Sequence, residues 1–369
     1  MTGDPDDPTD DAPDAIAADA DAAGFREYLR AKRTVDDRAL DRRLVGLFRE
    51  RLADRAAATE GSLRVLEVGA GVGTMVARLI DWAVLPPGET RYVAVDRDAD
   101  ALAGVGPFLR AWAADRPDIS VSGAVLPDEG GALVVESGPR TVTVETVAAD
   151  AVAYAEAHAG EADALIGMAL LDVLGVDRLD SLLDALAPGG TYYFPITFDG
   201  ATRFRPPHPD DRAVERRYHQ HMDEKPGGNS RAGAAALSRL RAADGSTLLG
   251  VAGSDWVVRP ADGAGGDEGA GGDEGAGGSG GSYPADEARF LRHILDTVED
   301  AVGEVIAADG AVGGTTAGNE LPAGNELPAG NESPADLDAW LAERRRQLDA
   351  GELVYLTHQL DLLGRADDA

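Results

Sequence analysis

The sequence predicts an α/β protein: a doubly wound, mostly parallel seven-stranded sheet with helices on both faces and an N-terminal helical lid. Two observations predict this fold. Short apolar runs alternate with helical stretches along the middle of the chain, which is the pattern of β-α-β units and of a parallel sheet covered on both faces. The first apolar run passes into a glycine-rich turn, "RVLEVGAGVGTM" from Arg64 to Met75.

The composition is that of a globular chain with an unusual charge. Of the 369 residues, 44% are hydrophobic, which suffices for one large core or two modest ones. The formal net charge is -32, and only two of the 34 basic residues are lysines, a bias that we interpret as that of a salt-loving, haloarchaeal-type protein. With no basic surplus to bind phosphates, nucleic acid is not an expected partner. No cysteine is present, which excludes disulfides and thiolate metal sites.

The first segment, residues 1–24, is acidic and poor in large apolar side chains, so we expect a disordered tail. It has neither the basic nor the apolar region of a secretion signal. No apolar run in the chain approaches the roughly 20 residues that span a bilayer, so we expect a cytoplasmic protein without a membrane partner.

Residues 25–60 form the expected helical lid. The candidate capping residues are Thr34 and Asp36. Apolar side chains then recur at helical spacing, at Leu40, Leu44, Leu47, Phe48 and Leu52.

The expected core covers residues 61–260, with a substrate insertion at about 199–230. Its first five strands are predicted at 64–68, 91–95, 141–147, 164–168 and 191–197. Two later apolar runs, which begin at Ser246 and Glu352, supply the sixth and seventh strands. After the sixth strand we expect a Gly-rich linker at 261–282, a helix at 283–309 and a repeat linker at 310–334. Residues 335–365 then supply a helix and the last strand, which completes the core.

The spacing of the glycines distinguishes between nucleotide ligands. A dinucleotide turn needs G-x-G-x-x-G, but Thr74 stands where its third glycine would fall. This spacing argues against an NAD(P)-dependent oxidoreductase, the first alternative. The pattern is instead an acid, Glu67, followed by alternating glycines at Gly69, Gly71 and Gly73, and it resembles the first motif of class I S-adenosylmethionine-dependent methyltransferases.

Three later segments extend the resemblance. They are "RYVAVDRD", which contains Asp96, "VAADAVAYAEA", which contains Asp150, and "DALAPGGTYYF" at 184–194, which resembles the helix, turn and fifth strand of this family. The resemblance implies S-adenosylmethionine as cofactor, with Asp96 on the ribose hydroxyls and Asp150 at the adenine amino group. The implied cofactor-binding residues are Glu67, Gly69, Ala70, Gly71, Gly73, Asp96, Arg97, Asp150 and Ala151.

The insertion after the fifth strand is the candidate acceptor site. Between Arg203 and Lys225 it holds six basic and five acidic residues, in a chain that is otherwise strongly acidic. His219 or His221 would take the acceptor proton near neutral pH, unless this segment is simply a charged surface helix. The candidate substrate-binding residues are Arg33, Arg203, Tyr218 and Asp223. The histidines outside the insertion lack partners at ligand spacing, so no metal is expected.

These inferences predict an enzyme that transfers a methyl group from S-adenosylmethionine to an oxygen or nitrogen atom of a small molecule. The second alternative is a non-catalytic binding protein that keeps the fold. The sequence does not indicate an oligomeric state.

Overall fold

The computed structural model describes residues 24, 26–123, 131–261, 283–313 and 336–368. The expected acidic tail and the two expected linkers lie almost entirely outside the described residues. Residues 26–31 are helical and precede the first labelled helix, α2.

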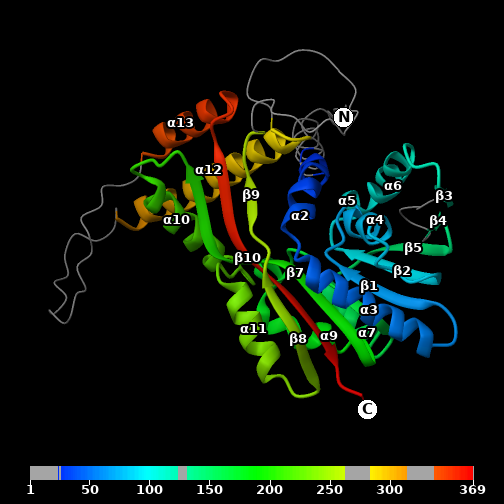
Figure 1. Cartoon of the computed structure of the whole chain (residues 1–369). Coiled ribbons are helices and arrows are strands. Elements are labelled where there is room, and N and C mark those ends of the chain that lie inside the picture. The colour runs from blue at the N-terminus through cyan, green and yellow to red at the C-terminus, as the bar shows by residue number, and fades with distance from the viewer. Residues whose placement is uncertain (1–23, 25, 124–130, 262–282, 314–335, 369) are drawn as a thin grey trace, which may run out of the picture.

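A single sheet runs through the described chain (Figure 1). Its strands are β1 (Leu63–Val68), β2 (Gly88–Asp96), β3 (Ile119–Gly123), β4 (Ala132–Ser137), β5 (Arg140–Ala148), β6 (Ala162–Ile166), β7 (Leu186–Arg205), β8 (Ser246–Gly253), β9 (Trp256–Val258) and β10 (Val354–Ala366). They follow the order β3-β4-β5-β2-β1-β6-β7-β10-β8, and β9 pairs with β10.

The centre of the sheet is parallel. Strands β5, β2, β1, β6 and β7 pair in parallel, and β10 lies antiparallel between β7 and β8. Since β8 is antiparallel to β10, it points the same way as β7. The predicted α/β class and mostly parallel sheet are therefore confirmed. The chain leaves β1 toward β2 on one side and later returns to β6 on the other, so the strand order reverses between β1 and β6, where open α/β sheets bind their ligands.

The predicted strand number was too small, because the residues that the structure describes already form ten strands of the sheet and not seven. The hairpin β3–β4 adds two antiparallel strands at one edge, where Gly138 and Pro139 turn the chain from β4 into β5. The apolar run from Ser246 is divided at Ser254 and Asp255 into β8 and β9, which gives the third extra strand.

Helices lie on both faces of the sheet. They are α2 (Arg33–Ala39), α3 (Arg42–Ala58), α4 (Thr74–Asp81), α5 (Ala99–Ala103), α6 (Val105–Ala113), α7 (Ala151–Ala157), α8 (Leu171–Leu174), α9 (Leu179–Leu183), α10 (Asp211–Glu224), α11 (Ala232–Ala242), α12 (Glu287–Gly313) and α13 (Leu337–Asp349), with a 3-10 turn at Val176–Arg178. None of the helices that the structure describes combines the length and apolar composition of a membrane span.

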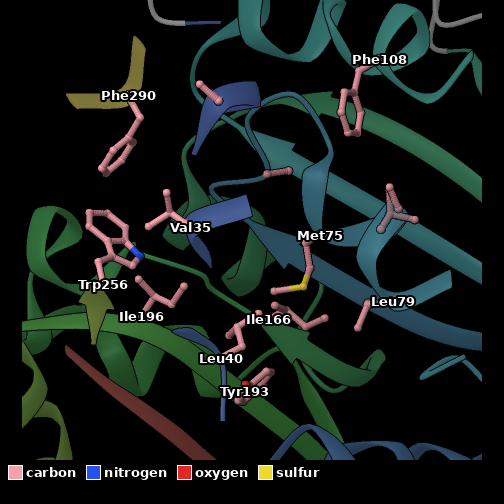
Figure 2. Close-up of a cluster of buried hydrophobic side chains, with 14 of the residues drawn as sticks. Val35, Leu40, Met75, Leu79, Phe108, Ile166, Tyr193, Ile196, Trp256 and Phe290 are labelled. Atoms are coloured by element: carbon pink, nitrogen blue, oxygen red, sulfur yellow. The ribbon is translucent and has the colours of Figure 1, made fainter. Parts of the chain in front are cut away.

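Two buried clusters of apolar side chains cover the two faces, because successive residues of a strand point to opposite sides. In β1, Val65 packs into the cluster formed with α3, α4 and α6, whereas Leu66 packs into the cluster formed with α7, α9 and α11. Figure 2 shows part of the first cluster, with Met75 of α4 beside Ile166 of β6.

The far halves of β7 and β10 leave the body of the sheet and carry an outer lobe, which also contains β9, α10, α12 and α13 (Figure 1). These two strands stay paired to their outer ends, where Arg205 lies opposite Val354. Segments that are far apart in the sequence therefore meet above the carboxyl ends of the central strands.

The expected N-terminal helix is broken in two. Asp41, and not Thr34 or Asp36, caps α3, because its side chain accepts a hydrogen bond from the Leu44 amide at 2.8 Å. Leu40, with ψ of 127°, ends α2 just before this cap.

Helix α2 joins the core to the outer lobe. Arg38 forms a bidentate ion pair with Glu287 at the start of α12. On the core side, Arg78 of α4 donates from Nε to Asp37.

Candidate active site at the carboxyl ends of the central strands

A cavity of about 720 Å³ lies at the carboxyl ends of β1, β2 and β6, within the usual size range of small-molecule sites. One wall, the glycine wall, follows these strand ends and contains Glu67, residues 69–72, residues 96–98 and residues 149–152. A second wall, the aromatic wall, comes from the N-terminal helices and the outer lobe. The aromatic wall contains Tyr28, Tyr218, Trp256, His293 and Tyr355.

The turn after β1 lines the cavity with backbone atoms rather than side chains. Gly69 and Gly71 have φ of 72° and 53°, in the left-handed region that favours glycine. A Cβ on Gly69 would lie 2.9 Å from Leu170 Cδ1, and one on Gly71 would lie 3.0 Å from Leu29 Cδ1. The Gly69 amide donates to the Val95 carbonyl at 2.9 Å, which ties the turn to β2. The missing side chains allow close packing and leave backbone lining the cavity.

Asp96 ends β2 and holds this turn in place. Its Oδ2 accepts from the Gly71 amide at 2.8 Å, and its Oδ1 accepts from the Asp98 amide at 2.9 Å. A carboxylate oxygen has two lone pairs, so each oxygen can accept a further hydrogen bond from a ligand. Since Asp96 lines the cavity, the unused lone pairs of its two oxygens can accept hydrogen bonds from two neighbouring hydroxyl groups of a ligand.

Glu67 is the buried acid of the glycine wall. Its side chain is almost fully buried, and its Oε2 accepts a hydrogen bond from the Tyr92 hydroxyl at 2.7 Å. Burial raises the pKa of Glu67 to about 8, although the Tyr92 hydrogen bond and the charge of Arg78 act in the opposite direction. At neutral pH this carboxyl group is mostly protonated, and a cation bound beside it would favour its ionised form.

Asp150 caps α7, since its Oδ1 accepts from the amides of Val152 and Ala153, both at 3.0 Å. Asp150, Ala151 and Arg97 all line the cavity, so eight of the nine predicted cofactor-binding residues are brought together there. The ninth, Gly73, lies outside the cavity lining. A Cβ on Gly73 would meet Val105 Cγ1 at 3.1 Å, so this glycine lets the chain pass closely under α6.

The two predicted catalytic histidines do not line the cavity. His219 Nε2 lies 3.2 Å from Thr202 Oγ1, and His221 Nε2 lies 2.9 Å from Glu304 Oε2. Helical geometry explains this result, because Tyr218 and Met222, four residues apart on α10, share the face that borders the cavity. The positions of His219 and His221 do not support the role of base that we expected for them.

Of the four predicted substrate-binding residues, only Tyr218 lines the cavity. Arg33 donates to Asp81 at 2.6 Å, and Arg203 forms an ion pair with Glu215. Asp223 accepts from the amide and the hydroxyl of Ser230, at 2.7 and 3.1 Å. In the structure these three side chains contact other residues of the protein and lie outside the cavity lining.

Several further residues line the cavity beside the predicted site residues. Lys32 Nζ lies 2.9 Å from Asp36 Oδ2, and Asp36 Oδ1 accepts from Trp256 Nε1 at 3.0 Å. Asp172, the second residue of α8, also lines the cavity. In the sequence, Lys32 stands with Arg30 and Arg33 in a basic cluster that is a candidate for neutralising a ligand carboxylate, but Asp172 and Tyr355 carried no such signal. Within the described ranges, no three histidine, aspartate or glutamate side chains are gathered as metal ligands would be.

No protein family model matches the chain, and no curated protein matches its sequence. Solved structures of similar fold include a protein from Galdieria sulphuraria assigned as a sarcosine dimethylglycine methyltransferase. It is 11% identical, with a TM-score of 0.34 over 88% of this chain and 86% of that one. Coclaurine N-methyltransferase, bound to N-methylheliamine and SAH, is 11% identical, with a TM-score of 0.35 over 87% of this chain and 69% of that one.

Phosphoethanolamine N-methyltransferase 2 of Haemonchus contortus, in complex with S-adenosyl-L-methionine, is also 11% identical. Its TM-score is 0.30, over 87% of this chain and 52% of that one.

Proposed function

We propose that this chain is an S-adenosylmethionine-dependent methyltransferase that acts on an oxygen or nitrogen atom of a small molecule. The observation that carries the proposal is one cavity with two chemically different walls. The glycine wall presents backbone and the carboxyl groups of Glu67, Asp96 and Asp150, and the aromatic wall presents aromatic rings and hydroxyls. A cationic nucleoside suits the first wall, and an acceptor molecule suits the second.

The hydrogen-bond acceptors of the glycine wall fit S-adenosylmethionine. Asp96 has lone pairs left for the two ribose hydroxyls, and Asp150 is available to the adenine amino group. Glu67 suits the ammonium group, since ionisation next to a cation removes the cost of a buried charge. When bound, this cofactor supplies an electrophilic methyl group on a sulfonium sulfur.

The protein's contribution to the reaction is positioning and exclusion of water. Methyl transfer is an in-line displacement, for which correct orientation in a water-excluded site supplies much of the rate. Tyr28, Leu29 and Lys32 border the cavity from the N-terminal helical segment. We propose that this segment and α2 act as the lid over both ligands.

A nicotinamide cofactor is disfavoured by two features. Thr74 replaces the third glycine of a dinucleotide turn. In a dinucleotide-binding sheet the sixth strand follows the fifth directly, whereas here β10 is inserted antiparallel between β7 and β8.

Calorimetric titration of the full chain with S-adenosylmethionine and with NAD tests the proposal. We expect binding of S-adenosylmethionine and none of NAD, and we expect label from methyl-labelled cofactor to enter a small molecule of a metabolite extract. Binding of NAD without binding of S-adenosylmethionine would overturn the proposal. Cofactor binding without any transfer of label would indicate the non-catalytic alternative.

A further inference from the structure

Asp172 lines the cavity with an unsatisfied acceptor. Its Oδ1 is buried and has no hydrogen-bond partner within the part of the chain that the structure describes. A buried carboxylate oxygen without a donor is costly, because the lost hydration is not replaced. A ligand that brings a donor to this atom would recover that cost.

The nearby positive charge is already neutralised. Lys32 Nζ is paired with Asp36 at 2.9 Å, and the same carboxylate also accepts from Trp256 Nε1. Burial raises the pKa of Asp172, whereas a backbone hydrogen bond and the charge of Lys32 lower it. Of these three causes, Lys32 has the smallest effect. The charges of Lys32 and Asp36 therefore neutralise each other, and Lys32 does not neutralise the charge of Asp172.

The tyrosines around Asp172 do not neutralise it either. After burial, the charge of Asp172 is among the causes that raise the pKa of Tyr28 and raise that of Tyr218 to about 12. Tyr355 is buried as well, and its pKa is raised far above the ordinary value. All three hydroxyls stay protonated and uncharged at physiological pH. Arg178 also lines the cavity, but its Nε lies 3.9 Å from Asp177 Oδ2, so its charge is already paired. None of these side chains therefore neutralises the negative charge of Asp172.

Apolar side chains complete this side of the cavity. Met168 follows the end of β6, Ile196 lies within β7, Met222 comes from α10, and Ile294 comes from α12. A ligand that fits here has a polar, cationic end at Asp172 and an apolar body.

We propose that the acceptor is an amine, bound through its protonated amino group by the Asp172 carboxylate, with its apolar body among Met168, Ile196 and Met222. This inference rests on the proposed methyl transfer and narrows its acceptor from an oxygen or nitrogen atom to nitrogen.

The chemistry of an ammonium group bound to the Asp172 carboxylate favours nitrogen as the methyl acceptor. In a water-excluded site, burial raises the pKa of a carboxylate and lowers that of an ammonium group, so a proton can pass from the ammonium to Asp172. The freed nitrogen lone pair then forms a bond to the methyl carbon as the carbon–sulfur bond breaks, and the sulfonium becomes a neutral thioether. The positive charge now lies on the methylated nitrogen, and Asp172 returns its proton to solvent.

An alcohol would use this site less well. It brings a donor to Asp172 but no positive charge, so the negative charge stays unbalanced. Burial raises the pKa of Asp172 to about 6, and a carboxylate of that basicity cannot remove the proton of an aliphatic hydroxyl to any useful extent.

The test compares amines with alcohols of the same shape. Butylamine, 2-phenylethylamine and tryptamine are each paired with butanol, 2-phenylethanol or tryptophol, and titrated into the full chain in the presence of S-adenosylhomocysteine. We expect at least one amine to bind about tenfold or more tightly than its alcohol, as a charge-assisted hydrogen bond predicts. Equal affinities in every pair, or no binding of any amine, would overturn the inference.

Two variants locate the effect. Asp172→Asn keeps the shape but removes the charge, and we expect it to abolish the preference for the amine while S-adenosylhomocysteine still binds. The matched control is Asp54→Asn, since the Asp54 side chain is exposed on α3 and lies outside the cavity lining, and it should keep the preference. An amine preference that survives in Asp172→Asn would contradict the assignment to this residue, and the wild-type comparison decides the matter if that variant does not fold.

The same titrations separate this inference from the proposed function. If S-adenosylhomocysteine binds but no amine is preferred, the inference fails and the methyltransferase proposal stands. If an Asp172-dependent amine preference is found without S-adenosylhomocysteine binding, the amine site stands and the methyltransferase proposal fails.

Discussion

The Tyr92 hydroxyl donates to Glu67 Oε2 at 2.7 Å, so a buried hydrogen bond joins β1 and β2 at the glycine wall of the cavity. Glu67 lines the cavity and Tyr92 does not. The tyrosine therefore acts on a ligand only through the carboxyl group that it contacts, and this pair gives the first two predictions.

Cofactor affinity should depend on pH through Glu67. The pKa of this group is raised to about 8, and a bound ammonium group would lower it again. Below pH 8 the protein must then release a proton on binding, so we expect affinity to fall by up to about tenfold for each pH unit between pH 8 and pH 6. Calorimetry in two buffers of different ionisation enthalpy measures both the affinity and the number of protons released. Glu67→Gln should remove the proton release, and an unchanged release in that variant would refute the assignment.

Tyr92→Phe should shift the midpoint of the pH dependence of cofactor affinity to higher pH. The Tyr92 hydrogen bond lowers the pKa of Glu67, so its loss raises that pKa further and makes ionisation harder. We also expect the free energy of unfolding to fall by about 1–3 kcal/mol, because the buried Glu67 oxygen loses its donor. Calorimetric titrations and urea unfolding measure the two effects. A pH midpoint that moves downward or stays fixed would contradict this prediction.

Asp96→Ala should weaken S-adenosylmethionine binding by about 1–3 kcal/mol, roughly fivefold to 150-fold, through the lost ribose hydrogen bonds and the loosened glycine turn. The matched control is Asp54→Ala, since the Asp54 side chain is exposed on α3 and distant in the chain from the turn. Isothermal titration gives the two affinities. Equal affinity in the Asp96 and Asp54 variants would show that Asp96 does not bind the ribose.

Arg78→Met should destabilise the fold and loosen α2. Arg78 is fully buried and donates to Asp37, whose side chain is 28% exposed. We therefore expect a loss of about 3 kcal/mol, at the lower end of the cost of breaking a buried ion pair. Arg51→Met removes a more exposed pair with Asp54 and should change the free energy of unfolding by well under 1 kcal/mol. Urea unfolding compares the two variants, and equal losses would contradict the prediction.

His221→Ala and His219→Ala test the histidine base that the sequence suggested. Both rings lie outside the cavity lining and contact Glu304 and Thr202 instead. We expect kcat to stay within about twofold of wild type once an acceptor is known, with cofactor affinity unchanged. Turnover lowered by a hundredfold without a change in thermal stability would restore the role first expected for these residues.

The sequence alone was informative wherever a short segment determines its own structure. The five central strands follow from runs of apolar residues, and the turn after β1 follows from glycines whose left-handed φ values few other residues adopt. Asp96 and Asp150 stand at the end of a strand and the start of a helix, positions that such a fold brings to one edge of the sheet. This is why the predicted cofactor-binding residues lie together, apart from Gly73.

The rest depended on contacts between distant segments. Strands β3 and β9 are short, with five and three residues, and β3 has no buried side chain, so local pattern does not mark them. Strand β4 holds its place in the sheet through its pairing with β3 on one side and β5 on the other. The face of α10 that meets the cavity is set by its packing against α12, and this packing brings in Tyr218 rather than His219 or His221.

The pairing of β7 with β10, about 150 residues apart in the chain, brings Tyr355 to the same cavity as Asp172. Local sequence determined the glycine wall because its residues follow directly from their own strands. Only the tertiary structure decided the aromatic wall and the unpaired charge of Asp172, because long-range packing determines which side chains share a cavity and which of their charges find a partner.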